Sequence, residues 1–174
     1  MNIIRQSIWQ YLQAQVGNKF LIFTLLAILP LTDSYTQTSF RIRDNISFPN
    51  FSVRISETVS FPDIKISISE NVSFEDFSVR VTTNRSQANF IITESSRADF
   101  SVRASENLSF PDLTIMAGRN ISFPDVKIKV KTSGNADYVV FTEKGYTSLT
   151  DLVIALLPVI NKKLDYRFKI IPVF

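Results

Sequence analysis

A short sequence unit recurs along most of this chain and constrains its fold more than any other feature. Each unit starts with an acidic or amide residue in most copies, then alternates apolar and polar residues, with Arg or Lys at the fifth place of several copies. Its first apolar residue recurs at steps of 10 to 13 residues: Phe40, Phe51, Ile64, Phe77, Phe90, Phe100, Leu113, Val126 and Tyr138. A period this short marks stacked or interlaced units that cannot bury their apolar faces alone.

The unit has the period of a half-buried strand. In residues 51–55 the apolar side chains Phe51, Val53 and Ile55 alternate with Ser52 and Arg54. This two-residue period predicts one face in the core and one face outward. No helical pattern occurs between residues 40 and 130, so the coarse class is all-β.

A shorter apolar arm follows the strand in five units and predicts a second, short strand. Its apolar pairs flank a serine, and we expect both members to contribute to the core: Ile46/Phe48, Val59/Phe61, Val72/Phe74, Leu108/Phe110 and Ile121/Phe123. Corners follow the arm, because proline presets φ and Asx side chains bond nearby backbone. Four of these arms end in proline followed by Asn or Asp, at residues 49–50, 62–63, 111–112 and 124–125.

The C-terminal part interrupts the repeat. Ser148-Leu149-Thr150-Asp151 has capping-box spacing, so we expect one helical insertion over residues 148–163, bent or ended early by Pro158. The unit then returns at residues 165–170, which predicts a further strand over residues 166–171.

Three segments resemble the Ser-Gln-Ala-Asp units of the septoil knot (seven-crossing knot) domain family: Ser86-Gln87-Ala88-Asn89-Phe90-Ile91-Ile92, residues 96–102 and residues 135–141. The resemblance covers about residues 40–142. It implies a compact, interlaced and knotted β structure, which would be an exception to the rule that chains avoid knots. It implies no activity and no catalytic residue.

We therefore predict an all-β, compact, interlaced or knotted β-repeat domain with one inserted C-terminal helix. The alternative is an open β-solenoid with coils of ~13 residues. The uneven steps favour interlacing, since they would break the register of a stacked coil. The repeat domain is expected over residues 37–174, behind a distinct segment over residues 1–36.

That N-terminal segment combines a helical stripe with an apolar run. Phe20–Thr32 is a run of thirteen residues between Lys19 and Asp33, with Arg5 and no acidic residue before it. Its length is typical of the apolar region of a signal peptide and short for a membrane span. The segment predicts a secreted, periplasmic or cell-surface protein. The alternatives are a membrane anchor and a helix packed on the β domain.

Composition excludes several kinds of chemistry. The chain has no cysteine and no histidine, which removes disulfides, thiol nucleophiles, thiolate or imidazole metal sites and histidine acid/base catalysis. A formal net charge of +3, mixed evenly along the repeats, does not indicate a nucleic-acid partner. We expect no enzymatic activity, no cofactor and no metal. Five aspartates recur at the corners, and we expect each to bond its own corner backbone: Asp63, Asp76, Asp99, Asp112 and Asp125. The alternative is that they form a carboxylate ladder that binds a hard cation.

Two sets of residues are candidates for binding. The first is a basic row on the outward strand face: Arg54, Arg80, Arg103 and Lys129. It either recognises an anionic glycan, lipid headgroup or other polyanion, or pairs with the glutamates at 57, 70 and 106. The second is a polar stretch that replaces the apolar arm in the middle units and is expected to face solvent or a partner: Arg85, Gln87 and Arg97. The sequence thus predicts a non-enzymatic structural or surface-interaction module, with a polyanion binder as the alternative.

Overall fold

The computed structural model describes residues 37–165 and 167–169. The apolar run Phe20–Thr32 and the rest of the N-terminal segment lie outside the described residues, and their targeting or anchoring function stays a prediction. Among the described helices, none is long and apolar enough to cross a membrane. The elements are β1 (Thr38–Arg43), β2 (Phe51–Ser56), β3 (Ile64–Ser69), β4 (Phe77–Thr82), a 3-10 turn η1 (Arg85–Gln87), β5 (Phe90–Ile92), β6 (Phe100–Ser105), β7 (Leu113–Gly118), β8 (Val126–Lys131), β9 (Tyr138–Thr142), α2 (Leu149–Ala155) and α3 (Leu157–Lys163).

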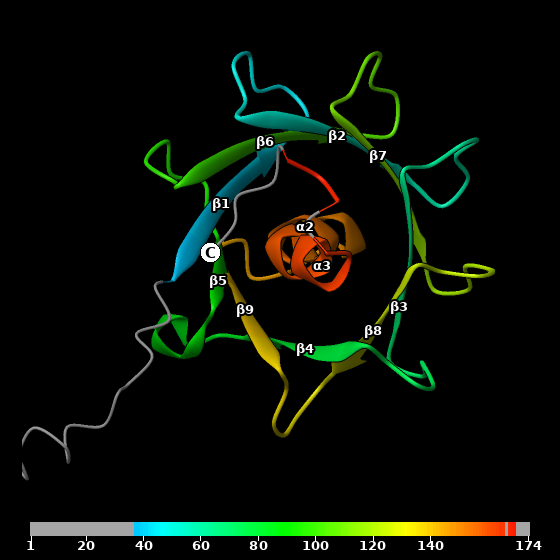
Figure 1. Ribbon diagram of the computed structural model, residues 1–174. Coiled ribbons are helices and arrows are strands. Elements are labelled where there is room, and N and C mark those ends of the chain that lie inside the picture. The colour runs from blue at the N-terminus through cyan, green and yellow to red at the C-terminus, as the bar shows by residue number, and fades with distance from the viewer. Residues whose placement is uncertain (1–36, 166, 170–174) are drawn as a thin grey trace, which may run out of the picture. The chain divides into compact units, whose positions relative to one another are not determined.

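The nine described strands close into a barrel in which all neighbouring strands are parallel. Their order around the barrel is β1-β5-β9-β4-β8-β3-β7-β2-β6 (Figure 1). Each strand therefore lies two places from the next strand in the chain, and the place between them holds a strand from elsewhere in the sequence. The chain goes around the barrel twice, and the second circuit fills the gaps that the first circuit leaves.

The connections explain the sequence period. Seven of the eight links between consecutive strands are seven residues long and the last has six, so the steps of 10 and 11 come from the strands and the step of 12 comes from the last link. The step of 10 follows β5, which has three residues instead of six, and the step of 11 arises because β1 begins at Thr38, before Phe40. Seven extended residues reach about 25 Å, enough to return along a six-residue strand of about 20 Å. The links run outside the barrel and bring every strand back in the same direction (Figure 1).

The expected alternation is confirmed in most strands. In β2 the buried residues Phe51, Val53 and Ile55 point to the core, and the remaining positions are exposed or half-buried. The inward residues of the strands form one hydrophobic core with both helices.

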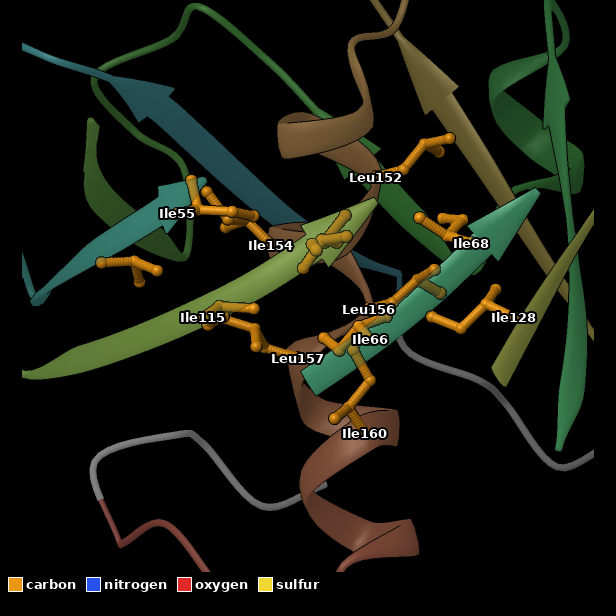
Figure 2. Close-up of a cluster of buried hydrophobic side chains, with 14 of the residues drawn as sticks. Ile55, Ile66, Ile68, Ile115, Ile128, Leu152, Ile154, Leu156, Leu157 and Ile160 are labelled. Atoms are coloured by element: carbon orange, nitrogen blue, oxygen red, sulfur yellow. The ribbon is translucent and has the colours of Figure 1, made fainter. Parts of the chain in front are cut away.

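The helices fill the interior of the barrel (Figure 1). Ile154, Leu156, Leu157 and Ile160 are fully buried and contact inward side chains of the strands, Ile66 and Ile115 among them (Figure 2). The stagger between strands makes room for this plug, because the third residue of one strand faces the first residue of its neighbour, as Val53 faces Leu113. Stagger and barrel size are linked, and a strongly staggered nine-stranded barrel is wider than its own side chains can fill.

The expected capping box is present, since the Asp151 N–H donates to Ser148 Oγ at 3.0 Å and the Ser148 N–H reaches Asp151 Oδ2 at 3.4 Å. The expectation of one inserted helix was wrong, because two short helices form. The first ends before Leu156, and Pro158 occupies the first turn of the second, where proline is tolerated.

The strand expected over residues 166–171 is not formed in its described part, residues 167–169, and its other residues lie outside the described ones. Asp165 has a positive φ of 55° and turns the chain out of the α3 direction. Phe168 then packs against the core, with its backbone bonded to Asn161. A helix that ends inside a closed barrel leaves no open edge to which a further strand could add.

Candidate functional site

The basic row is split into two pairs. Arg54 and Arg103 lie on the neighbouring strands β2 and β6, while Arg80 and Lys129 lie on the neighbouring strands β4 and β8. Two strands, β7 and β3, separate the pairs and carry Met116 and Ser67 at the equivalent places. The structure therefore does not bring the four residues together as one row.

The partners of the basic row also differ from the expected glutamate carboxylates. Arg54 Nε donates to the backbone oxygen of Glu106 and Arg103 Nε to that of Asp44, each at 3.1 Å. Lys129 Nζ lies 3.8 Å from a carboxylate oxygen of Glu75. These arginines hold the outer links against the barrel wall.

The middle polar stretch is exposed in full. Arg85 and Gln87 lie in η1, and Arg97 lies in the link between β5 and β6. Arg85 forms an ion pair with Glu143 at 2.9 Å. This contact and a hydrogen bond from the Thr93 hydroxyl hold the pKa of Glu143 below its usual range, the Thr93 bond being the larger cause. The stretch faces solvent on the side of β1, β5 and β9.

A ring of Asx side chains joins the amino-terminal ends of the strands. Eight links end in Asp or Asn, and the side-chain oxygen accepts a hydrogen bond of 2.7–2.9 Å from a backbone N–H of the neighbouring strand: Asn50, Asp63, Asp76, Asn89, Asp99, Asp112, Asp125 and Asp137. The expectation that these residues bond their own corner was wrong, because the donors lie 50 to 60 residues away. The ring is structural, and it explains why the sequence unit begins with Asp or Asn.

Some of these contacts include a serine hydroxyl. Ser78 donates to Asp137 Oδ2 from both its N–H and its hydroxyl at 2.7 Å. These two bonds lower the pKa of Asp137, the hydroxyl bond being the larger cause. In the part of the chain that the structure describes, no three acidic side chains gather as a metal site.

The most exposed apolar residues of the described chain are phenylalanines. Five of them have a relative exposure of 93–99%: Phe48, Phe61, Phe74, Phe110 and Phe123. The expectation that both members of each short arm are core residues was therefore wrong. Ile46, Val59 and Leu108 are buried under the links, whereas the phenylalanine two residues later points to solvent.

The backbone directs these phenylalanines outward. Phe61, Phe74, Phe110 and Phe123 have φ between 48° and 56°, the left-handed region that bulky side chains rarely adopt. This conformation costs about 1–2 kcal/mol per residue. It also interrupts the two-residue alternation, so the first apolar residue of the arm and the phenylalanine fall on opposite sides. Core packing does not explain these five residues, because their side chains are exposed. Four of them also have a strained backbone, which is typical of functional sites.

The five links are consecutive around the barrel. Each link crosses outside the strand that lies between the two strands it joins, so the tips follow the order Phe48, Phe110, Phe61, Phe123 and Phe74 over β6, β2, β7, β3 and β8. Figure 1 shows these links fanned outward along one side of the barrel, from the cyan loop to the green one. We call these five residues the phenylalanine row. The three links without such a phenylalanine, residues 83–89 with η1, 93–99 and 132–137, occupy the other side.

The links that carry the row are acidic. Residues 44–50, 57–63, 70–76, 106–112 and 119–125 contain nine carboxylates and one arginine, a formal charge of −8. Apart from Arg119, the lysines and arginines near the row belong to the strands beneath. Four of the nine carboxylates belong to the Asx ring, and the other five lie elsewhere on the links: Asp44, Glu57, Glu70, Glu75 and Glu106.

Comparison with known proteins adds the family. The model of the 7(1) septoil knot domain matches residues 42–127. This segment is a septoil knot domain. The resemblance of the repeat units to that family is thereby confirmed. No curated protein matches the chain.

The match runs from β1 into β8, so it includes all five phenylalanine links of the septoil knot domain. The barrel extends beyond it, because β9 completes the wall and α2 and α3 fill the interior.

One depression opens at the carboxyl-terminal ends of the strands. It has a volume of about 550 Å³ and is lined by charged and hydroxyl side chains that include Arg43, Glu94, Lys144, Tyr146 and Asp151. Glu94 is already paired with Arg43 and with Lys144, the latter at 3.2 Å, and these contacts lower its pKa, the Arg43 hydrogen bond being the larger cause. Its lining carries two cationic side chains, Arg43 and Lys144, and three carboxylates, Asp44, Glu94 and Asp151, so most of its charge is balanced within the depression.

Sequence reasoning missed the phenylalanine row, although one signal for it was present. A seven-residue link between parallel strands must run outside the barrel, and only one side of such a link can face the wall. One residue of each apolar pair therefore has no core to enter.

Proposed function

We propose that the septoil knot domain is a non-enzymatic surface-interaction module that binds an apolar surface through its phenylalanine row. The observation that supports this is the near-complete exposure of Phe48, Phe61, Phe74, Phe110 and Phe123 at equivalent link tips. Single exposed apolar side chains are ordinary, but a repeated series on one side of a protein marks an interaction site. Each ring offers about 150–250 Å² of apolar surface to a partner.

The test compares two variants of the full chain. In the first, all five phenylalanines of the row are replaced by serine. In the second, Arg85, Gln87 and Arg97 are replaced by serine, which changes an exposed polar stretch on the other side of the barrel. We expect the first variant to lose most of the wild-type retention on a phenyl-substituted resin at high salt, and the second to keep it. Equal retention of the first variant and the wild type would overturn the proposal.

The alternative function is binding of an anionic glycan, lipid headgroup or other polyanion through Arg54, Arg80, Arg103 and Lys129. The division of these residues into two pairs and the acidic links outside them weaken it. Salt-sensitive binding to a heparin column that disappears when the four residues are replaced by alanine would favour it over the phenylalanine row.

We also propose that the chain path is knotted rather than an open solenoid. The two interleaved circuits of the strand order support this. Because the chain has no cysteine, Gln37→Cys and Lys169→Cys introduce a unique pair. Joining them with a flexible bismaleimide in the folded state traps any knot. After denaturation we expect this product to be more compact than the same chain joined while unfolded, and equal hydrodynamic radii would contradict the knot.

A further inference from the structure

We propose that the apolar surface is an uncharged lipid bilayer, into which two or three adjacent phenylalanines of the row insert. This inference rests on the proposed function and names the partner of the same site.

The first argument is that the row consists of separate tips. The apolar residue two places before each phenylalanine is buried at Ile46, Val59 and Leu108 and half-buried at Val72 and Ile121, so it adds little to the exposed surface. A specific protein partner buries a continuous patch of about 800 Å² per side around an apolar centre. A bilayer needs no such continuity, because each ring enters the interface independently of the next.

The second argument is electrostatic. The links that carry the row have a formal charge of −8, and they extend further from the barrel axis than the basic strands do (Figure 1). Anionic lipids would repel these carboxylates at short range, whereas a zwitterionic or uncharged surface does not. The row thus selects against the anionic surface that the basic residues alone would favour.

The third argument comes from the sequence before β1. The apolar run Phe20–Thr32 is expected to be a signal-peptide region, with a membrane anchor as the alternative, and five residues separate it from Thr38. Five extended residues reach about 17 Å. In the anchor alternative, attachment to the same membrane raises the effective concentration of the row at the lipid, so even weak insertion of single rings would be effective.

The curvature of the barrel limits how many rings insert together. The row follows five of the nine strands, about half of the circumference, so one flat surface meets adjacent tips and not all five. The three central positions, Phe110, Phe61 and Phe123, are the best placed for simultaneous contact.

The experiment uses tryptophan fluorescence, because Trp9 is the single tryptophan of the chain. In a full-length Trp9→Phe background, each residue of the row is replaced by tryptophan in turn. Tyr146→Trp is the matched control, since Tyr146 is also an exposed aromatic residue but lies outside the row. Each variant is reconstituted with phosphatidylcholine vesicles and with vesicles that contain phosphatidylserine.

We expect a blue shift of the emission and protection from acrylamide at two or three adjacent positions in phosphatidylcholine, and neither effect for Tyr146→Trp. Phosphatidylserine should reduce both effects at low ionic strength. Emission unchanged at all five positions would overturn the lipid inference, and so would an equal shift for Tyr146→Trp. If the serine variant nevertheless loses its retention on the phenyl resin, the row has another apolar partner and the proposed function stands.

Discussion

Asn161 holds the backbone of Phe168 from both sides. Its Nδ2 donates to the Phe168 carbonyl and its Oδ1 accepts from the Phe168 N–H, both at 2.9 Å. Asn161 is buried, and its amide bonds the N–H and the carbonyl of Phe168 as a neighbouring strand would. This contact fixes the end of the helical plug.

We expect Asn161→Ala to lower the free energy of unfolding by about 2–3 kcal/mol, because two bonds are lost and partly buried backbone groups remain. Asn161→Asp should cost less, since one oxygen still accepts from the Phe168 N–H. Urea titration measures both. A loss no larger than that of the exposed neighbour Lys162→Ala would show that the clamp contributes nothing.

The helices inside the barrel should contribute as much to the free energy of unfolding as the strands of the wall. Leu157 is fully buried between α3 and the strands, so Leu157→Ala should cost about 2–5 kcal/mol. Lys163→Ala removes only an exposed ion pair with Asp76 and should cost less than about 1 kcal/mol. Equal losses in denaturant titration would mean that the helices are not part of the core.

The two faces of a strand give a third prediction. Val102 is fully buried and Arg103 is exposed, so Val102→Ala should cost about 1–3 kcal/mol and Arg103→Ala less than about 0.5. The pair Val79→Ala and Arg80→Ala should behave in the same way. Thermal unfolding of the four variants checks this, and larger losses for the arginines would reverse the inward and outward faces.

Three carboxylates give stability that depends on pH: Asp137 in the Asx ring, and Glu94 and Glu143 outside it. The folded-state pKa of Asp137 is lowered, as are those of Glu94 and Glu143. Each such group stabilises the fold at pH above its ordinary pKa, and this contribution disappears as the pH falls through the lower folded-state pKa. The fold should therefore lose stability progressively below about pH 4.

Asp137→Asn tests the origin of that loss, because Asn50 and Asn89 occupy equivalent places in the ring. The variant should stay folded at neutral pH with a smaller decrease in stability on acidification. Asp137→Ala should cost about 1–2 kcal/mol at neutral pH. An unchanged acid dependence in Asp137→Asn would assign the pH effect to other carboxylates.

The strands were predictable from the sequence because each has a local cause. Alternation in residues 51–55 fixes which side chains enter the core, and the capping box at Ser148 fixes the start of α2. These features depend on neighbours within a few residues.

The features that sequence reasoning missed depend on partners far away in the chain. The donor to Asp112 is Ser52, sixty residues earlier. The position of the helices inside the barrel depends on all nine strands that surround them. The outward direction of Phe61 depends on a positive φ that alternation cannot reveal. The same is true of the basic row, which looks continuous along the sequence but is divided by the strand order.

The central claim is that the phenylalanine row is kept for contact at a cost in stability. Phe61→Gly and Phe110→Gly test it most directly, because glycine adopts their positive φ without strain. Relief of about 1–2 kcal/mol per residue is partly offset by the greater flexibility of glycine in the unfolded chain. In urea titration we predict that each variant is as stable as the wild type or up to about 1 kcal/mol more stable. A loss of about 3–5 kcal/mol, as for a core phenylalanine, would contradict the account.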